Sequence, residues 1–186
     1  MEWKDVSIKD YEELVQYKDD SSFTDIAIKV LFDVEEPQML PVSVYTKYLS
    51  ELQFVGEPIK PEKLVTSWKV DDRGYEIDIN TPSFTIGQFT DFENYKKQQP
   101  YSLIDILSVV VIPKGHKYND GYDMDVVKSD IGTMRITLGY AIFNFFAQWC
   151  FRYVNTLNSY LKHQKNQDKR LVKILEKMET TLNLLR

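Results

Sequence analysis

A nearly continuous apolar run from residue 136 to 151 constrains this chain more than any other feature. It lies between Arg135 and Arg152, so as a helix rising 1.5 Å per residue it is roughly 24 Å long. That length falls short of the roughly 30 Å hydrocarbon layer of a bilayer. The amides of Asn144 and Gln148 also lie within the run. We therefore interpret it as a central helix buried on nearly all sides, not as a membrane span.

Three short helices are predicted before this point, each with apolar residues three and four positions apart. The first begins after Ser7, whose hydroxyl suits an N-cap. The second begins after Ser21-Ser22 and carries Asp25 in its first turn, where a negative charge is favourable. The third has Pro41 in its first turn. These segments predict a helical first quarter of the chain.

A β-hairpin is predicted near residues 66–80. Residues 67–70 and 75–79 alternate between apolar and polar side chains, and the turn signal at residues 71–74 separates them. An isolated hairpin is marginally stable in water. We favour packing against helices of the same chain and keep pairing with a second chain as the alternative. The apolar residues of the hairpin are Trp68, Val70, Tyr75, Ile77 and Ile79, and Trp68, Tyr75 and Ile77 are candidate interface residues.

The middle of the chain is less clear. Thr85 is a suitable N-cap for a helix through residues 89–95. The apolar segment 103–112 fits either a buried strand or a buried helix, and we favour a helix because Leu103, Ile106 and Leu107 share one face. A loop is expected from Gly115 to Gly121.

Two long helices, or one interrupted helix, are predicted at the end, from about Ile131 to His163 and from Asp168 to Leu185. The second is amphipathic, and its stripe either docks on its own domain or binds a partner. The sequence thus predicts a mainly α fold: a helical domain over residues 1–166 with one small hairpin, and a C-terminal helical arm over 167–186. The candidate interface residues of the arm are Leu171, Leu175, Met178, Leu182 and Leu185.

Residues typical of catalysis or metal binding are sparse. Cys150 is the single cysteine and is interpreted as a small buried residue. The two histidines, His116 and His163, have no Cys or His at ligand spacing, which argues against zinc. The acids at 119–125 do not match a calcium loop, and no phosphate loop, dinucleotide fingerprint or nucleophile elbow occurs. With a net charge of −5, nucleic-acid binding is not expected either. The prediction is no catalytic residue, no metal, no cofactor and no small-molecule substrate.

One stretch resembles a known family. Residues 85–93 (TIGQFTDFE) precede an apolar segment beginning LIDILSV at Leu103, then Ile112-Pro113 and a loop at residues 115–118. This pattern is similar to one in small tail-assembly-chaperone-like proteins of tailed bacteriophages, particularly phages of Bacteroides-type gut hosts. The short helix after Ser7 and the Leu40-Pro41 segment also resemble that family. The likeness covers roughly residues 5–160, and the amphipathic C-terminal arm departs from it.

The resemblance implies a non-catalytic phage assembly or virion structural protein. Because of the arm, we expect a retained neck or tail ring component that binds other phage structural proteins and forms a homo-oligomeric ring. A transient tail-assembly chaperone absent from the mature virion is the alternative, as is a helical protein-binding adaptor unrelated to phage. The expected location is the virion, or the host cytoplasm during assembly.

Overall fold

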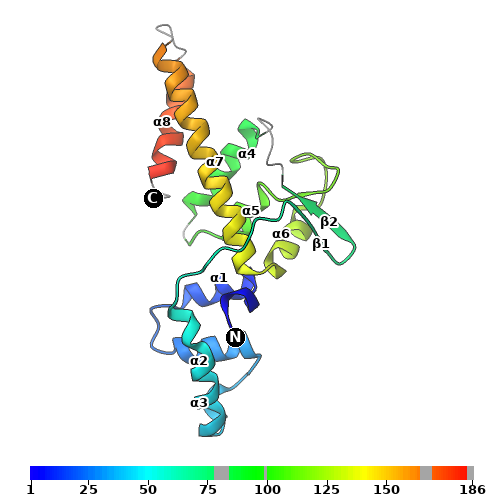
Figure 1. The fold of residues 1–186 in the computed structure, drawn as a ribbon, viewed down its shortest axis with the longest axis vertical. Coiled ribbons are helices and arrows are strands. Elements are labelled where there is room, and N and C mark those ends of the chain that lie inside the picture. Colours follow the sequence, from blue (N-terminus) through cyan, green and yellow to red (C-terminus); the bar gives the residue numbers. More distant parts are fainter. Residues whose placement is uncertain (78–83, 99, 164–168, 184–186) are drawn as a thin grey trace. The chain divides into compact units, whose positions relative to one another are not determined.

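The computed structural model describes residues 1–77, 84–98, 100–163 and 169–183, and it confirms a mainly helical fold with a small sheet (Figure 1). The chain forms two compact units, Met1–Ala141 and Ile142–Arg186. The domain boundary predicted between residues 166 and 167 lies outside the described residues. The elements of the first unit are η1 (Trp3–Asp5), α1 (Ile8–Gln16), α2 (Phe23–Phe32), η2 (Pro37–Met39), α3 (Val42–Glu51), η3 (Leu52–Gly56), β1 (Ser67–Val70), β2 (Arg73–Glu76), α4 (Ile86–Lys97), α5 (Leu103–Ser108), β3 (Ile112–Pro113), α6 (Met124–Thr133) and the start of α7 (Ile136–His163).

The three N-terminal helices begin close to their predicted positions. The Ser7 hydroxyl accepts a hydrogen bond from the backbone N–H of Asp10 at 3.1 Å, so the predicted cap of α1 is confirmed. α2 ends at Phe32, and the following Asp33 adopts the left-handed conformation with φ +54°. Pro41 was expected in the first turn of α3 but lies just before it. Its ψ of 140° is extended, so the helix begins at Val42.

The hairpin is tighter than predicted and belongs to a three-stranded antiparallel sheet of order β1-β2-β3. Val70 pairs with Arg73, which leaves a two-residue turn whose first residue, Asp71, has φ +50°. The second strand therefore begins at Arg73, two residues earlier than expected, and ends at Glu76. Residues 78 and 79 of the predicted strand lie outside the described residues.

The apolar segment 103–112 contains both of the structures considered for it. α5 covers Leu103–Ser108, with the Ser102 hydroxyl accepting from the N–H of Asp105 at 3.2 Å. A turn follows, and Ile112 then pairs with Glu76 as the start of β3. The prediction of a single helix is therefore wrong at its C-terminal end, because the chain leaves the helix to complete the sheet.

The core of the first unit lies where α1, α5 and α6 pack against one another, with α2 on α1 and α4 on α5. The side chains that fill the core come from α1, α2, α4, α5, α6, α7 and the segments next to them. Those that are at most 1% exposed include Val6, Ile8, Ile28, Phe92, Leu107, Val109, Val111, Val127, Ile131 and Ile136.

A sharp corner separates α6 from α7, where the sequence predicted a helix already running at Ile131. Met134 is extended, with ψ 150°, and α6 ends at Thr133. The N-terminal strand-like segment holds this corner: the N–H of Ile8 donates to the Met134 carbonyl at 2.8 Å, and the N–H of Ile136 donates to the Val6 carbonyl at 2.9 Å. The corner satisfies backbone groups that an uninterrupted helix would have paired internally.

The second unit contains the rest of α7 and α8 (Lys169–Asn183). Cys150 is buried in α7, as the sequence predicted. Leu175 and Met178 of α8 are each 6% exposed. Among the described residues no helix is long and apolar enough to cross a membrane.

Candidate functional site

An open groove of about 850 Å³ lies among the N-terminal helices. We refer to it as the N-terminal groove. Its walls come from η1, α1, α2, the end of α3 and η3, with Tyr140 of α7 contributing from the first unit. The lining residues are Trp3, Tyr11, Leu14, Val15, Lys18, Phe23, Thr24, Ala27, Leu49, Leu52, Gln53, Val55, Gly56, Glu57, Pro58, Ile59 and Tyr140.

The groove exists because these helices keep apolar side chains on a face that the other described residues of their unit leave open. Val15 and Leu49 line it, and each is 40% exposed. Burying side chains of this size contributes about 1.5–3 kcal/mol each, so leaving them open forgoes stability. A contiguous exposed apolar surface rimmed by polar residues is typical of an interaction site.

The polar atoms of the aromatic side chains in the groove already have partners. The indole N–H of Trp3 donates to the Glu57 carbonyl at 2.8 Å, and the hydroxyls of Tyr11 and Tyr140 lie 3.0 Å apart. Burial, followed by the bond to Tyr140, raises the pKa of Tyr11 above its usual value, so the phenol stays neutral. Trp3 packs edge-on against Tyr11, with 5.8 Å between ring centroids. These contacts fix the wall and leave an apolar surface.

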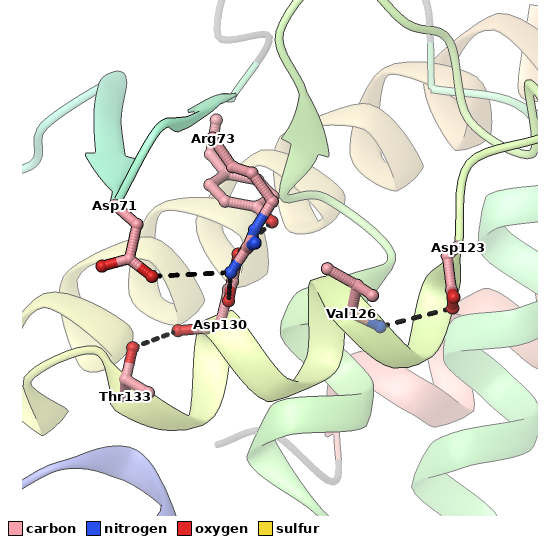
Figure 2. A network of polar contacts seen from close by, with 7 residues as sticks. Asp71, Arg73, Asp123, Val126, Asp130 and Thr133 are labelled. Carbon is pink, nitrogen blue, oxygen red and sulfur yellow. Dashed lines mark hydrogen bonds and ion pairs between the residues drawn. The ribbon is translucent and has the colours of Figure 1, made fainter.

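A second candidate is the polar cluster that joins β2 to α6 (Figure 2). Asp130 is 5% exposed and accepts two hydrogen bonds from the Arg73 guanidinium, at 2.6 and 2.7 Å. The Tyr75 hydroxyl donates to the same carboxylate at 2.5 Å, and Asp71 approaches Arg73 at 3.8 Å from the hairpin turn.

The charges in this cluster are arranged for stability. Hydrogen bonds from Arg73 hold the pKa of Asp130 below its usual range, so the carboxylate is ionised at neutral pH. Burial, together with the bond to Asp130, raises the pKa of Tyr75 to about 12. A phenol held neutral and a carboxylate with two donors are poorly suited to proton transfer near pH 7. The arrangement instead pins the sheet to α6.

A smaller cavity of about 470 Å³ lies beside this cluster. Lys69, Lys114 and His116 reach it, together with Asp123, the N-cap of α6. His116 is 3.8 Å from Asp120, a distance that allows only a weak ion pair. Among the described residues no three His, Cys, Asp or Glu side chains gather as a metal site would require. The cavity therefore offers mixed charges without a clear ligand.

The residues on which the resemblance to phage proteins rests form hydrogen bonds that connect helices and loops; we refer to these contacts as joints. Thr85 and Gln88 make a reciprocal capping box at the start of α4, which confirms the predicted cap. The buried Gln88 amide also donates to the Val109 carbonyl at 2.9 Å, and the Tyr118 hydroxyl donates to Asp91 at 2.7 Å. The motif thus ties α4 to the turn after α5 and to the following loop.

Two glycines in or near these contacts have different surroundings. A Cβ at Gly87 would meet only the Thr85 hydroxyl, at 3.6 Å, so close packing does not require a glycine there. The close approach occurs at Gly139 in α7, where a Cβ would lie 2.7 Å from the Cδ1 atom of Ile8. Gly139, which the sequence did not single out, is the glycine that packing requires.

The interface candidates predicted from the sequence lie mostly inside the chain. Tyr75 and Ile77 are buried in the first unit, and Trp68 is half-buried with its ring 6.2 Å from that of Tyr75. Leu175 and Met178 are buried in the second unit. Partner binding by these residues stays a prediction, since their burial describes the single chain. The side chains of Leu171 and Leu182, and all of Leu185, lie outside what the structure describes.

Sequence reasoning missed the groove and the Arg73–Asp130 pair. The spacing of Val127, Asp130, Ile131 and Met134 was a usable signal, because it places an aspartate on the buried face of a helix. No comparable signal marks the groove. Its residues have ordinary amphipathic spacing, and only the tertiary arrangement leaves them uncovered.

Comparison with protein-family models, curated proteins and solved structures yields no match for this chain. The groove and the joints therefore carry the functional interpretation.

Proposed function

We propose that this chain is a non-catalytic assembly component of a tailed phage, which binds other structural proteins and is retained in the neck or tail as part of a homo-oligomeric ring. The observation that carries the binding role is the N-terminal groove, a large and mainly apolar surface with exposed aliphatic side chains at its rim. The phage context rests on the resemblance of residues 85–118 to tail-assembly-chaperone-like proteins.

The contacts of the motif residues support a scaffold role for that segment. Gln88 and Asp91 bond to Val109 and Tyr118, so their polar atoms serve the fold and do not face an open pocket together. Phage assembly proteins of this kind need a stable frame and a contact surface, and residues 85–118 supply the frame in this proposal.

Retention in the particle is favoured over a transient role by the C-terminal arm. α8 is amphipathic, with Lys173, Glu176 and Lys177 exposed opposite the buried Leu175 and Met178. A weak contact repeated around a ring gains strength from multivalency. A transient tail-assembly chaperone with the same groove is the alternative within phage assembly, and a helical adaptor unrelated to phage is the alternative outside it.

Quantitative mass spectrometry of purified particles from the source of this sequence tests the proposal. A copy number close to a multiple of six or twelve is expected for a ring component. Abundance in infected lysate with absence from the particles would replace the ring component by the transient chaperone. If the source makes no phage particle, the interpretation as a helical adaptor unrelated to phage would replace the phage proposal.

The role of the arm has its own test, the pair Leu175→Glu and Leu182→Glu. A lower oligomer order with an unchanged melting temperature supports assembly through the arm. A large fall in melting temperature of the monomer would show that the arm serves the fold of its own unit instead.

A further inference from the structure

The charge around the N-terminal groove differs from that of the rest of the chain. Residues 1–59, which provide all of the lining except Tyr140, contain thirteen Asp or Glu and five Lys, a net charge of −8. The whole chain has a net charge of −5, so residues 60–186 carry +3. The groove is therefore an apolar surface set in the acidic part of the molecule.

Exposed carboxylates lie at or next to the lining. Glu57 lines the groove with its side chain exposed, and Asp19 follows the lining residue Lys18. Lys18 and Glu57 are the charged residues of the lining and balance each other, so the negative charge comes from the carboxylates around the groove. A field of one sign next to an apolar surface selects partners of the opposite charge and speeds their association.

The residues of the lining favour binding of apolar side chains of a peptide over binding of a small polar ligand. Twelve of the seventeen lining residues are apolar or aromatic. Trp3 Nε1 already donates to a backbone carbonyl, and the two tyrosine hydroxyls bond each other. Small-molecule sites usually add a few convergent polar groups that orient the ligand. Grooves between helices with aliphatic rims instead accept the apolar face of an amphipathic helix.

We propose that the N-terminal groove binds an amphipathic helix of another protein, with an apolar face of residues spaced three and four apart and Lys or Arg along its flanks. This inference deepens the proposed binding role by naming the chemistry of the partner, and it rests on that role. Apolar side chains of the helix fill the space between Val15 and Leu49, while its cations face Glu57 and Asp19.

A second copy of this chain is a weaker candidate for the occupant. Its α8 is amphipathic and carries four Lys or Arg against two Glu over residues 169–183. However, Leu175 and Met178 of that helix are already buried within their own chain. Docking α8 would require that stripe to leave its present packing, whereas a separate helix has no such requirement.

The test uses the full chain and two synthetic helical peptides. Both have leucine at i, i+3, i+4 and i+7, and they differ only in carrying lysine or glutamate on the flanks. Fluorescence anisotropy of labelled peptide measures affinity at about 50 mM and about 500 mM salt. We expect the lysine peptide to bind at least about tenfold more tightly than the glutamate peptide at low salt, and this preference to shrink at high salt.

Variants of the groove separate its apolar and charged contributions. Leu49→Asp should weaken binding of the lysine peptide at least about tenfold, because it places a charge in the apolar contact. The pair Glu57→Lys and Asp19→Lys should weaken it by a similar factor at low salt only. The matched control is the pair Asp72→Lys and Glu179→Lys, which makes the same change in net charge at exposed positions outside residues 1–59. It should bind within about twofold of the unchanged chain.

Several results would overturn the proposal. Equal binding of the two peptides would show that the acidic charge does not select the partner. Binding unaffected by Leu49→Asp would show that the peptide does not bind in the groove. Self-association of the chain that Leu49→Asp abolishes would make a second copy the occupant. Binding of an apolar dye that the lysine peptide does not displace would indicate a small-molecule site.

Folding is checked by thermal melting, and Val15→Asp replaces Leu49→Asp if that variant does not fold. Failure of peptide binding leaves the particle measurement untouched, so the proposed assembly role and this inference fail separately.

Discussion

Two helices of the same unit use their side chains in opposite ways. α3 has ten residues and buries none of them, whereas α5 has six and buries Leu103, Ile106, Leu107 and Ser108. Both helices carry apolar side chains, four of six residues in α5 and five of ten in α3, so part of the difference must come from which elements pack on them. α5 is enclosed by α1, α4 and α6, while α3 contacts only α2 and η3 to any extent.

The difference extends to the polar residues. Around α5 and α6 polar side chains form hydrogen bonds that connect different elements, as Asp130 does with Arg73 and Gln88 does with Val109. Around α1 to α3 most carboxylates are exposed and add to a negative field, although half-buried Glu12 accepts a hydrogen bond from the N–H of Ile104 at 2.9 Å. We infer that the α5–α6 region determines stability and that the α1–α3 region is available for a partner.

The largest expected contrast comes from one leucine in each region. Leu107 is fully buried, so Leu107→Ala should lower the free energy of unfolding by about 3 kcal/mol. Leu49 is 40% exposed, so Leu49→Ala should cost less than about 1 kcal/mol. Urea denaturation of both variants measures the difference. Equal losses would mean that the groove is a packed part of the core, and the comparison would fail.

A pair of glycines gives the next largest effect. Gly139→Val places atoms where Ile8 and Leu107 already lie, at 2.7 and 3.4 Å from the Cβ, and should destabilise by about 2 kcal/mol. Gly87→Ala meets only a 3.6 Å contact and should be neutral or stabilising by up to about 1 kcal/mol. Thermal melting of the two variants checks the signs, which should be opposite. If Gly139→Val were stabilising, the side chains at the α1–α7 contact would have to rearrange at little cost in free energy.

The sequence predicted local features well where one residue determines them. Ser7 and Thr85 cap their helices because a side-chain oxygen needs only a nearby N–H, and both caps form. The mainly helical class also followed from periodicity. Boundaries set by distant contacts were missed: α6 ends at Thr133 because Val6 and Ile8 bond to the corner, and no residue near Ile131 signals this.

The candidate site was harder to predict for the same reason. Tyr75 and Ile77 were predicted on the apolar face of the hairpin, and both side chains are buried within the chain, with the Tyr75 hydroxyl bonded to Asp130 of α6. Val15 and Leu49 have the same apolar character and remain open. Exposure depends on which elements pack together, and one sequence without tertiary contacts does not contain that information in a readable form.

The buried carboxylate of Asp130 should make the stability of the protein depend on pH in acid. Hydrogen bonds from Arg73 lower the folded-state pKa of Asp130, so its contribution to stability is complete above the usual pKa near 3.8 and is lost as pH falls through the folded value. Asp130→Asn should cost about 1–2 kcal/mol at pH 7. It should also flatten the fall in stability below about pH 4. Denaturation at several pH values measures both effects, and an unchanged acid profile would assign the acid sensitivity to other carboxylates.

The smallest expected effect compares two hydrogen bonds from a tyrosine hydroxyl to an aspartate. One involves α4 and the loop after β3, and the other joins α2 and α3. Tyr118 donates to Asp91 and Tyr45 donates to Asp25, both at 2.7 Å. Burial is the main cause that raises the pKa of Tyr118, whereas the bond to Asp25 is the main cause for Tyr45. Bonds sheltered from water contribute more, so Tyr118→Phe should cost about 1 kcal/mol and Tyr45→Phe roughly half of that.

The same pair predicts an alkaline signature. A folded-state pKa raised above the usual value near 10 means that the native chain holds its proton more tightly than the unfolded one. The contribution of Tyr118 is therefore complete below about pH 10 and declines as pH rises further. Tyr118→Phe should reduce the loss of stability between about pH 9 and pH 11 more than Tyr45→Phe does. Equal effects would indicate that water reaches both bonds alike, and the division between a closed and an open region would then rest on apolar burial alone.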